Sequence, residues 1–561
     1  MAQNVTIANV DYSNVPSVRI PKTIGIDDAI FYDTSDADMT ASDLAEGKVG
    51  YTSTGKVIGT SSGGGGGGGD EEADVIFYDP FGNIVYTYSA EDFLGLASLP
   101  AMPSITGFTS QEWNWTLADA QEYVEDYGKI DIGLSVIPTD GMTHILIDVD
   151  EAPLAYAIHC QTSSSSYTGT IDWGDGTTDT FSNTRASGAY IHTYTAVGNY
   201  EIIVSSTTRL STFEIGRYSS TTYNWKAPVA NPQATKAIYY GANCCTSITN
   251  EIGGNIEYIT LPNGLGMTSR QAISYLPALK FLVLPKGFTT LPNSFAQYCA
   301  NIKGVILPKS ITTIPTNFAY YTSNIKRMII PNSVTSIGNS AFLMSKELTT
   351  VTIPNSVTSI GSSVFQNTHI TTIAIPNTVT TIGGSAFNNA HYLEEIKIPS
   401  SVTTFGASVF YLCYGLKRVT FEGSMSTLPS STFYNCRSLQ EVVFPTGLTT
   451  IESQCFGYCV TMSELTIPEG VTTLSSSSIF TNMVSLSKLT LPSTLTTING
   501  SQFDSNTVLT EIHMLGTTPP TLSTSSIMSG ANSYIYVPAE AVEAYQTATN
   551  WTGVASRIVG E

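Results

Sequence analysis

Positive charge is scarce in this chain. Lys and Arg together number 24 of 561 residues, against 45 Asp and Glu, so the formal net charge is -21. Such a balance repels phosphate groups, and we therefore expect no binding of nucleic acid by the chain as a whole. No run of about 18 apolar residues is present that could span a bilayer. The opening segment MAQNVTIANVDYSNVPSVRIPK has neither the basic start nor the apolar centre of a secretory signal, and no LPxTG sorting motif occurs.

Catalytic and metal-binding patterns are also missing. The histidines show no HxxxH or HExxH spacing, and the sequence holds no P-loop and no Ser-His-Asp motif. The segment DVIFYDPFGNIV superficially resembles the phosphotransfer loop of haloacid-dehalogenase-like enzymes. That chemistry needs a carboxylate two residues after Asp79, where Phe81 stands instead. We therefore expect a protein that is not an enzyme and that needs no cofactor.

The sequence is rich in repetition. The phrase IPNSVTSIG begins at Ile330 and begins again 23 residues later. A proline returns at nearly this spacing along the chain: Pro262, Pro285, Pro308, Pro331, Pro354, Pro376, Pro399, Pro445, Pro468 and Pro492. Glu422 occupies one position where a proline is expected. A fixed period of about 20–50 residues predicts a stacked array, because one such unit cannot bury its apolar face alone.

Counted from each proline, apolar residues recur at positions +3, +6, +10, +11, +14, +17, +20 and +22. The last three predict a strand, and the Ala-Phe or Val-Phe pair at +10 and +11 predicts a short helical turn on the opposite wall. Proline ends each strand because it has no N–H to donate, and the glycines at +7 allow a tight corner.

Position +14 selects small side chains, because Ala and Ser occur there as well as cysteine. Four of the eight cysteines share this position: Cys299, Cys413, Cys436 and Cys459. The spacing of the cysteines does not match a zinc site, so we expect reduced, packed thiols.

The pass along the chain predicts a mainly β, multi-domain protein. Short strands are expected at residues 1–60 and a polyglycine linker at 61–72. A small α/β module of a hairpin plus a helix should follow at 73–140, a β-sandwich at 141–208 and a repeat solenoid at 209–515, before a last segment at 516–561. Within the module, Thr116 is expected to cap a helix that Gly128 ends.

Two motifs resemble known families. The unit LxxVxIPxxVxxIGxxAFxxC resembles the BspA-like leucine-rich repeats, also called the Treponema pallidum type, over about residues 260–514, and residues 516–561 resemble the cap of that family. IDWGDGTTDT followed by YIHTYTAVGNYEIIV resembles a PKD-type immunoglobulin-like domain. These resemblances imply a leucine-rich-repeat solenoid and an Ig-like β-sandwich.

The front of the chain resembles structural proteins of tailed phages. The pattern TAxDxxxGKxxYxxxGxxxGT is carried by Thr40, Asp43, Gly47, Lys48, Tyr51, Gly55 and Gly59, and WNWTLADA is the most distinctive part of the segment that follows the linker. The resemblance implies that residues 1–60 attach the chain to other virion proteins, in the capsid or in the tail.

Side chains at +19 and +21 should point away from the solenoid core, because residues alternate across a strand. In the first rungs they form an apolar set with one arginine: Phe281, Val283, Ile306, Arg327 and Ile329. In later rungs they mix both charges: Glu395, Lys397, Arg418, Glu441, Glu464 and Lys488. Solenoid faces and exposed apolar patches bind partners, so these are the candidate binding residues. The alternatives are a solvated sheet for the charged set and packing against the irregular first repeats for the apolar set.

Three carboxylates in the WGDGT region are weak candidates for calcium binding. Asp172, Asp175 and Asp179 lie within eight residues. The same residues suit ordinary turn chemistry, which is the competing interpretation. No other metal site is predicted.

The leading hypothesis is a non-enzymatic protein on the virion surface of a tailed phage, as a capsid decoration, head fibre or tail fibre. Its repeats would adhere to a bacterial surface protein, to glycans or to mucus, without membrane insertion. The rivals are a BspA-like adhesin on the bacterial cell surface and a purely structural decoration. A homo-oligomer is left open.

Overall fold

The computed structural model describes residues 73–561 except 163–166, 183–189, 216–231, 243–246, 249–254, 265, 268–272, 475–477, 501, 504 and 525–532. Of residues 1–72 it describes the backbone of six strands, which pair in sequence as three antiparallel ribbons: β1 (Gln3–Ile7), β2 (Val10–Val15), β3 (Ser17–Ile20), β4 (Ala29–Tyr32), β5 (Val49–Thr52) and β6 (Gly55–Ile58). The candidate anchor residues lie outside the residues whose side chains are described: Thr40, Asp43, Gly47, Lys48, Tyr51, Gly55 and Gly59.

The module 73–140 is a four-stranded sheet with two helices. Its strands lie in the order β8-β7-β10-β9. The elements are β7 (Val75–Tyr78), β8 (Ile84–Tyr88), α1 (Ala90–Leu94), β9 (Phe108–Trp113), α2 (Leu117–Tyr127) and β10 (Ile130–Pro138). The predicted hairpin and helix are present: Thr116 accepts a hydrogen bond from Asp119 N, and Gly128 ends α2 with φ 74°. The strands β9 and β10 were not predicted.

Two sheets face each other after the module. The larger has the order β14-β13-β16-β11-β18-β20 and the smaller β15-β12-β17. The strands are β11 (Thr143–Val149), β12 (Leu154–Thr162), β13 (Gly169–Asp172), β14 (Thr178–Phe181), β15 (Tyr190–Tyr194), β16 (Gly198–Ser206), β17 (Leu210–Ile215), β18 (Thr235–Tyr239) and β20 (Tyr258–Thr260), with the 3-10 helix η2 (Pro232–Ala234) before β18. Trp173, Tyr156 and Ile202 fill the space between the sheets and are fully buried.

The sandwich does not end at residue 208, where the sequence placed its boundary. β17 completes the smaller sheet, and β18 extends the larger one, to which the first solenoid strand β20 adds in parallel. The sandwich and the solenoid therefore share one sheet and one continuous apolar core. The PKD-type identity of this sandwich stays a prediction.

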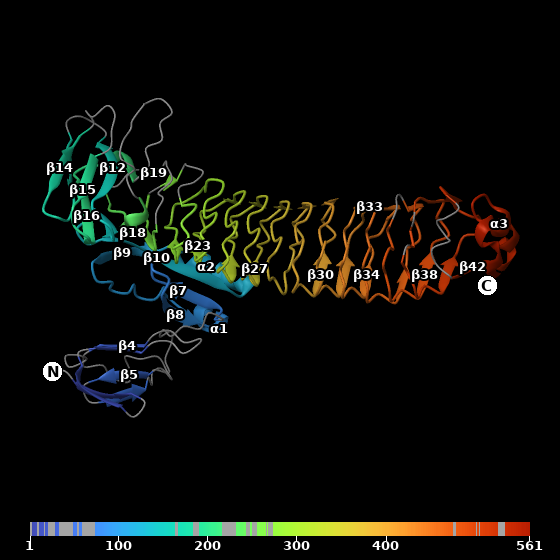
Figure 1. Cartoon of the computed structure of the whole chain (residues 1–561), viewed down its shortest axis with the longest axis horizontal. Helices are drawn as coiled ribbons and strands as arrows, with labels where there is room; N and C mark the ends of the chain where they lie inside the picture. The colour runs from blue at the N-terminus through green and yellow to red at the C-terminus, as the bar shows by residue number, and fades with distance from the viewer. Residues whose placement is uncertain are drawn as a thin grey trace.

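The solenoid has two walls of parallel strands. The outward strand face carries β22 (Leu282–Val283), β23 (Val305–Ile306), β25 (Arg327–Ile329), β27 (Thr350–Thr352), β30 (Glu395–Ile398), β32 (Arg418–Phe421), β34 (Glu441–Val443), β36 (Glu464–Thr466), β38 (Lys488–Leu491) and β40 (Glu511–Met514). The second wall carries β24 (Thr313–Ile314), β26 (Ser336–Ile337), β28 (Ser359–Ile360), β29 (Thr381–Ile382), β31 (Thr404–Phe405), β33 (Thr427–Leu428), β35 (Thr450–Ile451), β37 (Thr473–Leu474), β39 (Thr497–Ile498) and β41 (Thr521–Leu522). A short parallel pair, β19 (Ser247–Ile248) and β21 (Gly266–Met267), lies in the first repeats. Figure 1 shows these rungs stacked into one long rod.

The third wall consists of turns, so the predicted helical turn at +10 and +11 is wrong. Ser340 and Met344 flank the Ala-Phe pair in the left-handed region, with φ 55° and 64°. Single turns form here, as in the bond from Ser345 N to Phe342 O at 3.1 Å, but the left-handed residues at both ends stop a helix from continuing. The other N–H groups bond to the next rung: Phe342 N donates to Val364 O at 3.0 Å, and Ser340 N to Ser362 O at 2.8 Å.

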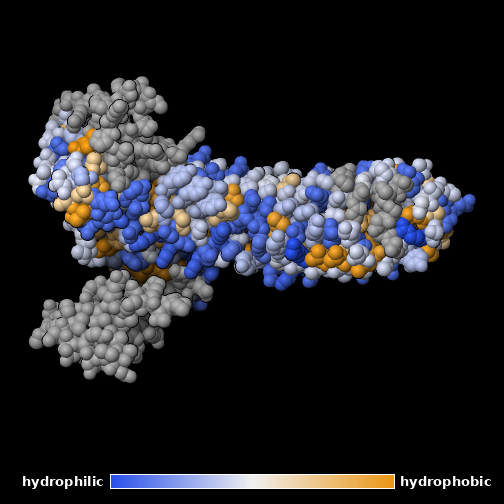
Figure 2. Space-filling view, in the orientation of Figure 1, coloured by the Kyte–Doolittle hydropathy of each residue, from blue (hydrophilic) through white to orange (hydrophobic). Residues whose placement is uncertain are grey.

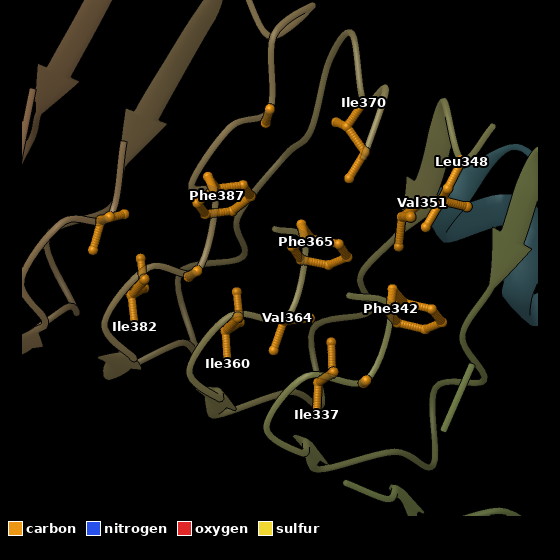
Figure 3. Packing of buried hydrophobic residues seen from close by; sticks show 14 of the residues in the cluster. Ile337, Phe342, Leu348, Val351, Ile360, Val364, Phe365, Ile370, Ile382 and Phe387 are labelled. Atoms are coloured by element: carbon orange, nitrogen blue, oxygen red, sulfur yellow. The ribbon is translucent and has the colours of Figure 1, made fainter. Parts of the chain in front are cut away.

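A column of buried phenylalanines runs along the core. The ring centroids of Phe342 and Phe365 lie 5.8 Å apart, and those of Phe365 and Phe387 lie 5.4 Å apart. All three side chains are fully buried. Figure 3 shows them one above another, with Ile337, Ile360 and Ile382 forming a second column beside them.

The glycines at +7 serve close packing of rungs and not a left-handed corner. A Cβ on Gly338 would lie 2.6 Å from the backbone nitrogen of Thr316, and one on Gly361 would lie 2.7 Å from that of Asn339. No φ in the left-handed range occurs at either glycine. The corner is tight because two backbones approach where no side chain fits.

Where position +14 holds Cys or Ser, its side chain can donate a hydrogen bond to the rung before it, whereas Ala390 fills the same place by volume alone. Cys413 Sγ donates to the Phe387 carbonyl at 3.0 Å, and Cys436 Sγ donates to the Phe410 carbonyl at the same distance. Ser345 makes the equivalent bond to the rung before it. Six cysteines are described, and all are free and buried, as expected: Cys160, Cys299, Cys413, Cys436, Cys455 and Cys459. Cys244 and Cys245 lie outside the described residues. Burial raises the pKa of the Cys413 thiol to about 12.

A cap closes the C-terminal end of the rod (Figure 1). It consists of β42 (Tyr534–Val537), η3 (Ala539–Ala541), α3 (Val542–Thr547), η4 (Thr552–Arg557) and β43 (Ile558–Gly560). Trp551 and Tyr545 are fully buried. The Trp551 indole donates to the Pro520 carbonyl at 2.9 Å, and the Tyr545 hydroxyl donates to the Gly516 carbonyl at 2.9 Å. These bonds fasten the cap over the last rung.

Candidate interaction surface

The apolar patch predicted on the first rungs is covered by the module 73–140. Its members are between 4% and 7% exposed: Phe281, Val283, Ile306 and Ile329. The rings of Tyr78 and Phe281 lie 5.0 Å apart, and a Cβ on Gly133 of β10 would come within 2.5 Å of Val283. The expectation of an exposed binding patch is therefore wrong, and so is the alternative of packing on the irregular first repeats. The patch packs against β10, which contacts β22 and β23, and against Tyr78 at the end of β7. Figure 1 shows β7 and β10 beside the first rungs.

Arg327 is also part of this internal interface. Its guanidinium donates to the carbonyls of Ala73 at 2.7 Å and Asp74 at 3.0 Å, and Nη2 lies 3.2 Å from Asp131 Oδ1. Both charged side chains are largely buried, at 13% and 8% exposed. Burial raises the pKa of the Asp131 carboxyl, and the positive charge of Arg327 only partly opposes that rise. Arg327 thus binds the module and is not free to bind a partner.

Three side chains of the module donate hydrogen bonds to three successive rungs. The pairs are Asn114 Nδ2 with Leu284 O at 3.1 Å, Trp115 Nε1 with Leu307 O at 2.9 Å, and the Tyr123 hydroxyl with Ile330 O at 2.7 Å. Each acceptor immediately precedes a proline of the repeat.

The prolines explain why these carbonyl groups are available. In a parallel ladder the Leu284 carbonyl would accept from the backbone N–H of residue 308, but Pro308 has none. The rung without proline shows the alternative, because Glu422 N donates to the Ile398 carbonyl at 2.9 Å. Each proline therefore leaves one carbonyl of the preceding rung without a ladder partner, and the module uses three in succession.

Ion pairs surround the apolar seat. Lys309 Nζ lies 2.6 Å from Asp119 Oδ1 and 3.1 Å from Glu122 Oε2, both on α2. Burial alone would raise the pKa of Asp119, but hydrogen bonds from Lys309 and Thr116 outweigh it and hold the pKa below its ordinary value. The first rungs and the module therefore form one packed unit with a charged rim.

The later half of the strand face is exposed as predicted. Along β30 burial alternates, with Glu395 and Lys397 exposed and Ile396 and Ile398 buried. The other candidates are exposed or, for the last, half-buried: Arg418, Glu441, Glu464 and Lys488. Arg418 Nη2 and Glu441 Oε2 lie 2.5 Å apart across neighbouring strands. Figure 2 shows a largely hydrophilic solenoid surface on which apolar residues form only small areas.

The three carboxylates of the WGDGT region do not converge on one point. Asp172 accepts from Gly174 N at 2.9 Å, and Asp179 accepts from the Trp173 indole at 3.0 Å. Asp175 accepts from the Thr177 hydroxyl at 2.6 Å, and its other oxygen lies 2.7 Å from His192 Nε2. These are the bonds of a turn. Among the described residues no group of three His, Cys, Asp or Glu side chains is arranged to hold a metal ion.

No helix in the described part of the chain is both long enough and apolar enough to cross a membrane. The described helices are short and half-exposed, and the longest, α2, covers one side of the module.

Comparison with protein families identifies the solenoid. The family described as BspA type Leucine rich repeat region matches residues 245–342, 315–439 and 426–532, which together span just over half of the chain. The chain belongs to this family. BspA-type repeats thus account for the 23-residue period and for the strand face.

Solved structures include similar proteins. A leucine-rich repeat protein from Bacteroides ovatus is 22% identical, with 54% of this chain and 90% of that chain covered and a TM-score of 0.42. A leucine rich cell surface protein from Faecalibacterium prausnitzii is 20% identical, with 55% and 91% covered and a TM-score of 0.34. The pneumococcal vaccine antigen PcpA is 18% identical, with 54% and 85% covered and a TM-score of 0.33. Comparison with curated proteins finds no similar sequence.

Sequence reasoning missed the side chains that fasten the module. Asn114, Trp115 and Tyr123 lie in or just after the segment WNWTLADA. One available signal was the missing N–H of the repeat prolines, which predicts unpaired carbonyls on the strand face. A row of such acceptors predicts that a neighbouring element brings donors.

Proposed function

We propose that this chain is a non-enzymatic binding protein displayed on a surface, and that it adheres through the strand face beyond the docked module. The observation that carries the proposal is the exposed charged series from Glu395 to Lys488, which follows one side of consecutive rungs. Extended solenoid faces bind partners, and many weak contacts on one particle or cell add up to avidity.

The setting we propose is the virion of a tailed phage, with residues 1–60 attached to the capsid or the tail. The motif from Thr40 to Gly59 supports this setting. The rival setting is the surface of a bacterial cell. Membership in the BspA-type family and the likeness to a leucine rich cell surface protein support the rival at least as well.

Mass spectrometry of fractionated material separates the two settings. The chain is expected in purified phage particles that have been freed of cell envelope. Its recovery only with cell envelopes would exclude the virion and favour the bacterial adhesin.

Charge reversal tests the adhesive face. Full-length protein with Lys397→Glu and Arg418→Glu is expected to lose binding to bacterial cells, to purified surface glycans or to mucin. The matched control is Lys346→Glu, which reverses an exposed lysine away from the candidate series. Equal binding by both proteins and the wild type would instead favour a purely structural decoration.

A further inference from the structure

A cleft of about 790 Å³ lies where the module meets the strand face. The module contributes Tyr78 and Lys129, and the rungs contribute Lys303, Asn324, Lys326 and Thr350. Pockets that bind small ligands usually measure about 300–1,000 Å³ and often lie between two structural units. The cleft is separate from the charged series that begins at Glu395.

The cleft is positively charged in a chain that is strongly negative. Four cationic side chains line it, Lys129, Lys303, Lys326 and Arg327, against two carboxylates, Asp131 and Glu347. With a formal net charge of -21 overall, such a local excess of positive charge is unusual for this protein. A recess lined by one sign of charge concentrates ions of the other sign.

The bottom of the cleft holds buried polar atoms that lack hydrogen-bond partners. Among the described residues Arg327 Nε has no hydrogen-bond acceptor, and Asp131 Oδ1 has the ion pair with Arg327 Nη2 at 3.2 Å but no hydrogen bond. Arg327 directs Nη1 and Nη2 to the carbonyls of Ala73 and Asp74. Buried polar groups are almost always paired in native folds, and exceptions call for an explanation such as a functional role.

The remaining lining offers what a sugar recognises. At one side lies the half-buried ring of Tyr78, which packs against the buried ring of Phe281 with the centroids 5.0 Å apart. Asn324 and Thr350 are exposed and provide neutral donors and acceptors at the other. A saccharide has apolar ring faces and polar edges, whereas a bare inorganic anion has only charge.

We propose that this cleft binds an anionic saccharide whose carboxylate lies among Lys129, Lys303 and Lys326 and whose ring contacts Tyr78. The site requires the module and the solenoid to be docked, because each supplies one wall. The inference does not depend on the setting in which the protein is displayed or on the exposed charged series.

Calorimetric titration of the full-length protein tests the proposal. The probes are trigalacturonate and sialyllactose, with the methyl ester of trigalacturonate as a matched uncharged sugar and inorganic phosphate as a bare anion. At least one of the acidic probes is expected to bind, more weakly as salt rises, and the ester and phosphate are expected to bind at least about tenfold more weakly.

Variants locate the binding. The double variant Lys129→Ala with Lys303→Ala is expected to bind the acidic sugar about tenfold more weakly or worse, since charge-assisted hydrogen bonds are lost. Thr350→Trp fills the cleft without changing charge and is expected to abolish binding. Lys346→Ala, outside the cleft, is the control.

Three results would overturn the proposal: no heat with either acidic sugar, equal binding of the ester or of phosphate, or unchanged affinity in both cleft variants. The charged-series variant Lys397→Glu with Arg418→Glu is expected to leave this titration unchanged. Failure of the adhesive face and failure of the cleft are therefore distinguishable.

Discussion

The guanidinium of Arg327 lies 3.2 Å from the carboxylate of Asp131, on the buried boundary between a solenoid rung and the module that precedes the array. Arg327 occupies a +19 position, which other rungs use for exposed residues such as Thr350 or Arg418. One side chain thus converts a repeated surface position into a unique contact.

Removing this arginine should loosen the module. Arg327→Ala leaves Asp131 buried without its partner, which typically costs about 3–5 kcal/mol. Urea unfolding followed by tryptophan fluorescence, together with limited proteolysis of residues 73–140, measures the effect. The control Arg418→Ala breaks an exposed pair and should cost less than about 1 kcal/mol. Similar small losses in both variants would contradict the role assigned to Arg327.

Restoring a backbone N–H should also weaken docking. Pro308→Ala provides a donor for the Leu284 carbonyl and so competes with Asn114 Nδ2, a loss of about 1 kcal/mol at the interface. Pro445→Ala restores a backbone N–H in the same way on a rung where no module is docked. It also raises the conformational entropy of the unfolded chain by the same amount. Hydrogen exchange of the module should therefore quicken in the first variant only. Equal exchange in both would show that the proline does not govern docking.

Acid should release the ion pairs at the rim. The pKa of Asp119 lies below its ordinary value of 3.8, so its contribution to stability is complete above that value and is lost as the pH falls through the lower folded pKa. Wild-type docking should weaken on this account below about pH 4, and Asp119→Asn should remove this part of the acid dependence. The raised pKa of Asp131 acts with the opposite sign, since that contribution is lost as the pH rises through the folded value. The difference in docking stability between the wild type and Asp119→Asn, followed against pH, isolates the contribution of the rim ion pairs. A difference that does not change with pH would contradict the assignment.

At the buried cysteine positions, replacement by serine should destabilise the protein less than replacement by alanine. Cys436→Ser keeps a donor for the Phe410 carbonyl, as Ser345 does for the Ala319 carbonyl of the rung before it. Cys436→Ala removes this donor, although the Phe410 carbonyl keeps its bond from Cys413 N at 3.1 Å, and should cost up to about 1 kcal/mol more than the serine variant. Thermal unfolding of both variants measures the difference. The reverse order would show that volume alone decides this position.

Much of the solenoid followed from the sequence, because a 23-residue period forces neighbouring rungs to present the same positions to one another. Val419 and Phe421 are buried and Arg418 is exposed, as the alternation requires. The turn wall was predicted wrongly. An Ala-Phe pair is compatible with a helix, and only the left-handed φ at residues such as Ser340 shows that the backbone bonds to the next rung instead.

The candidate surface was predicted only in part, for a physical reason. Outward orientation follows from strand geometry, but exposure depends on what else in the chain covers the strand. Nothing local to Phe281 or Ile329 reveals that β7 and β10, some 200 positions earlier, lie over them. Glu395 and Lys397 have no such cover, and for them orientation and exposure coincide.

Because the prolines recur, successive rungs offer the same backbone acceptor at the same place. A carbonyl without a ladder partner recurs wherever a rung is followed by proline, so the donors Asn114, Trp115 and Tyr123 would find acceptors equally well one rung further along. A shift by one rung would bring Thr350 to the place of Arg327 and leave Asp131 unmatched. Bonds to main-chain carbonyls therefore attach the module, and a few side chains that occur only once determine the rung at which it docks. Transplanting those side chains by 23 positions should move the module with them.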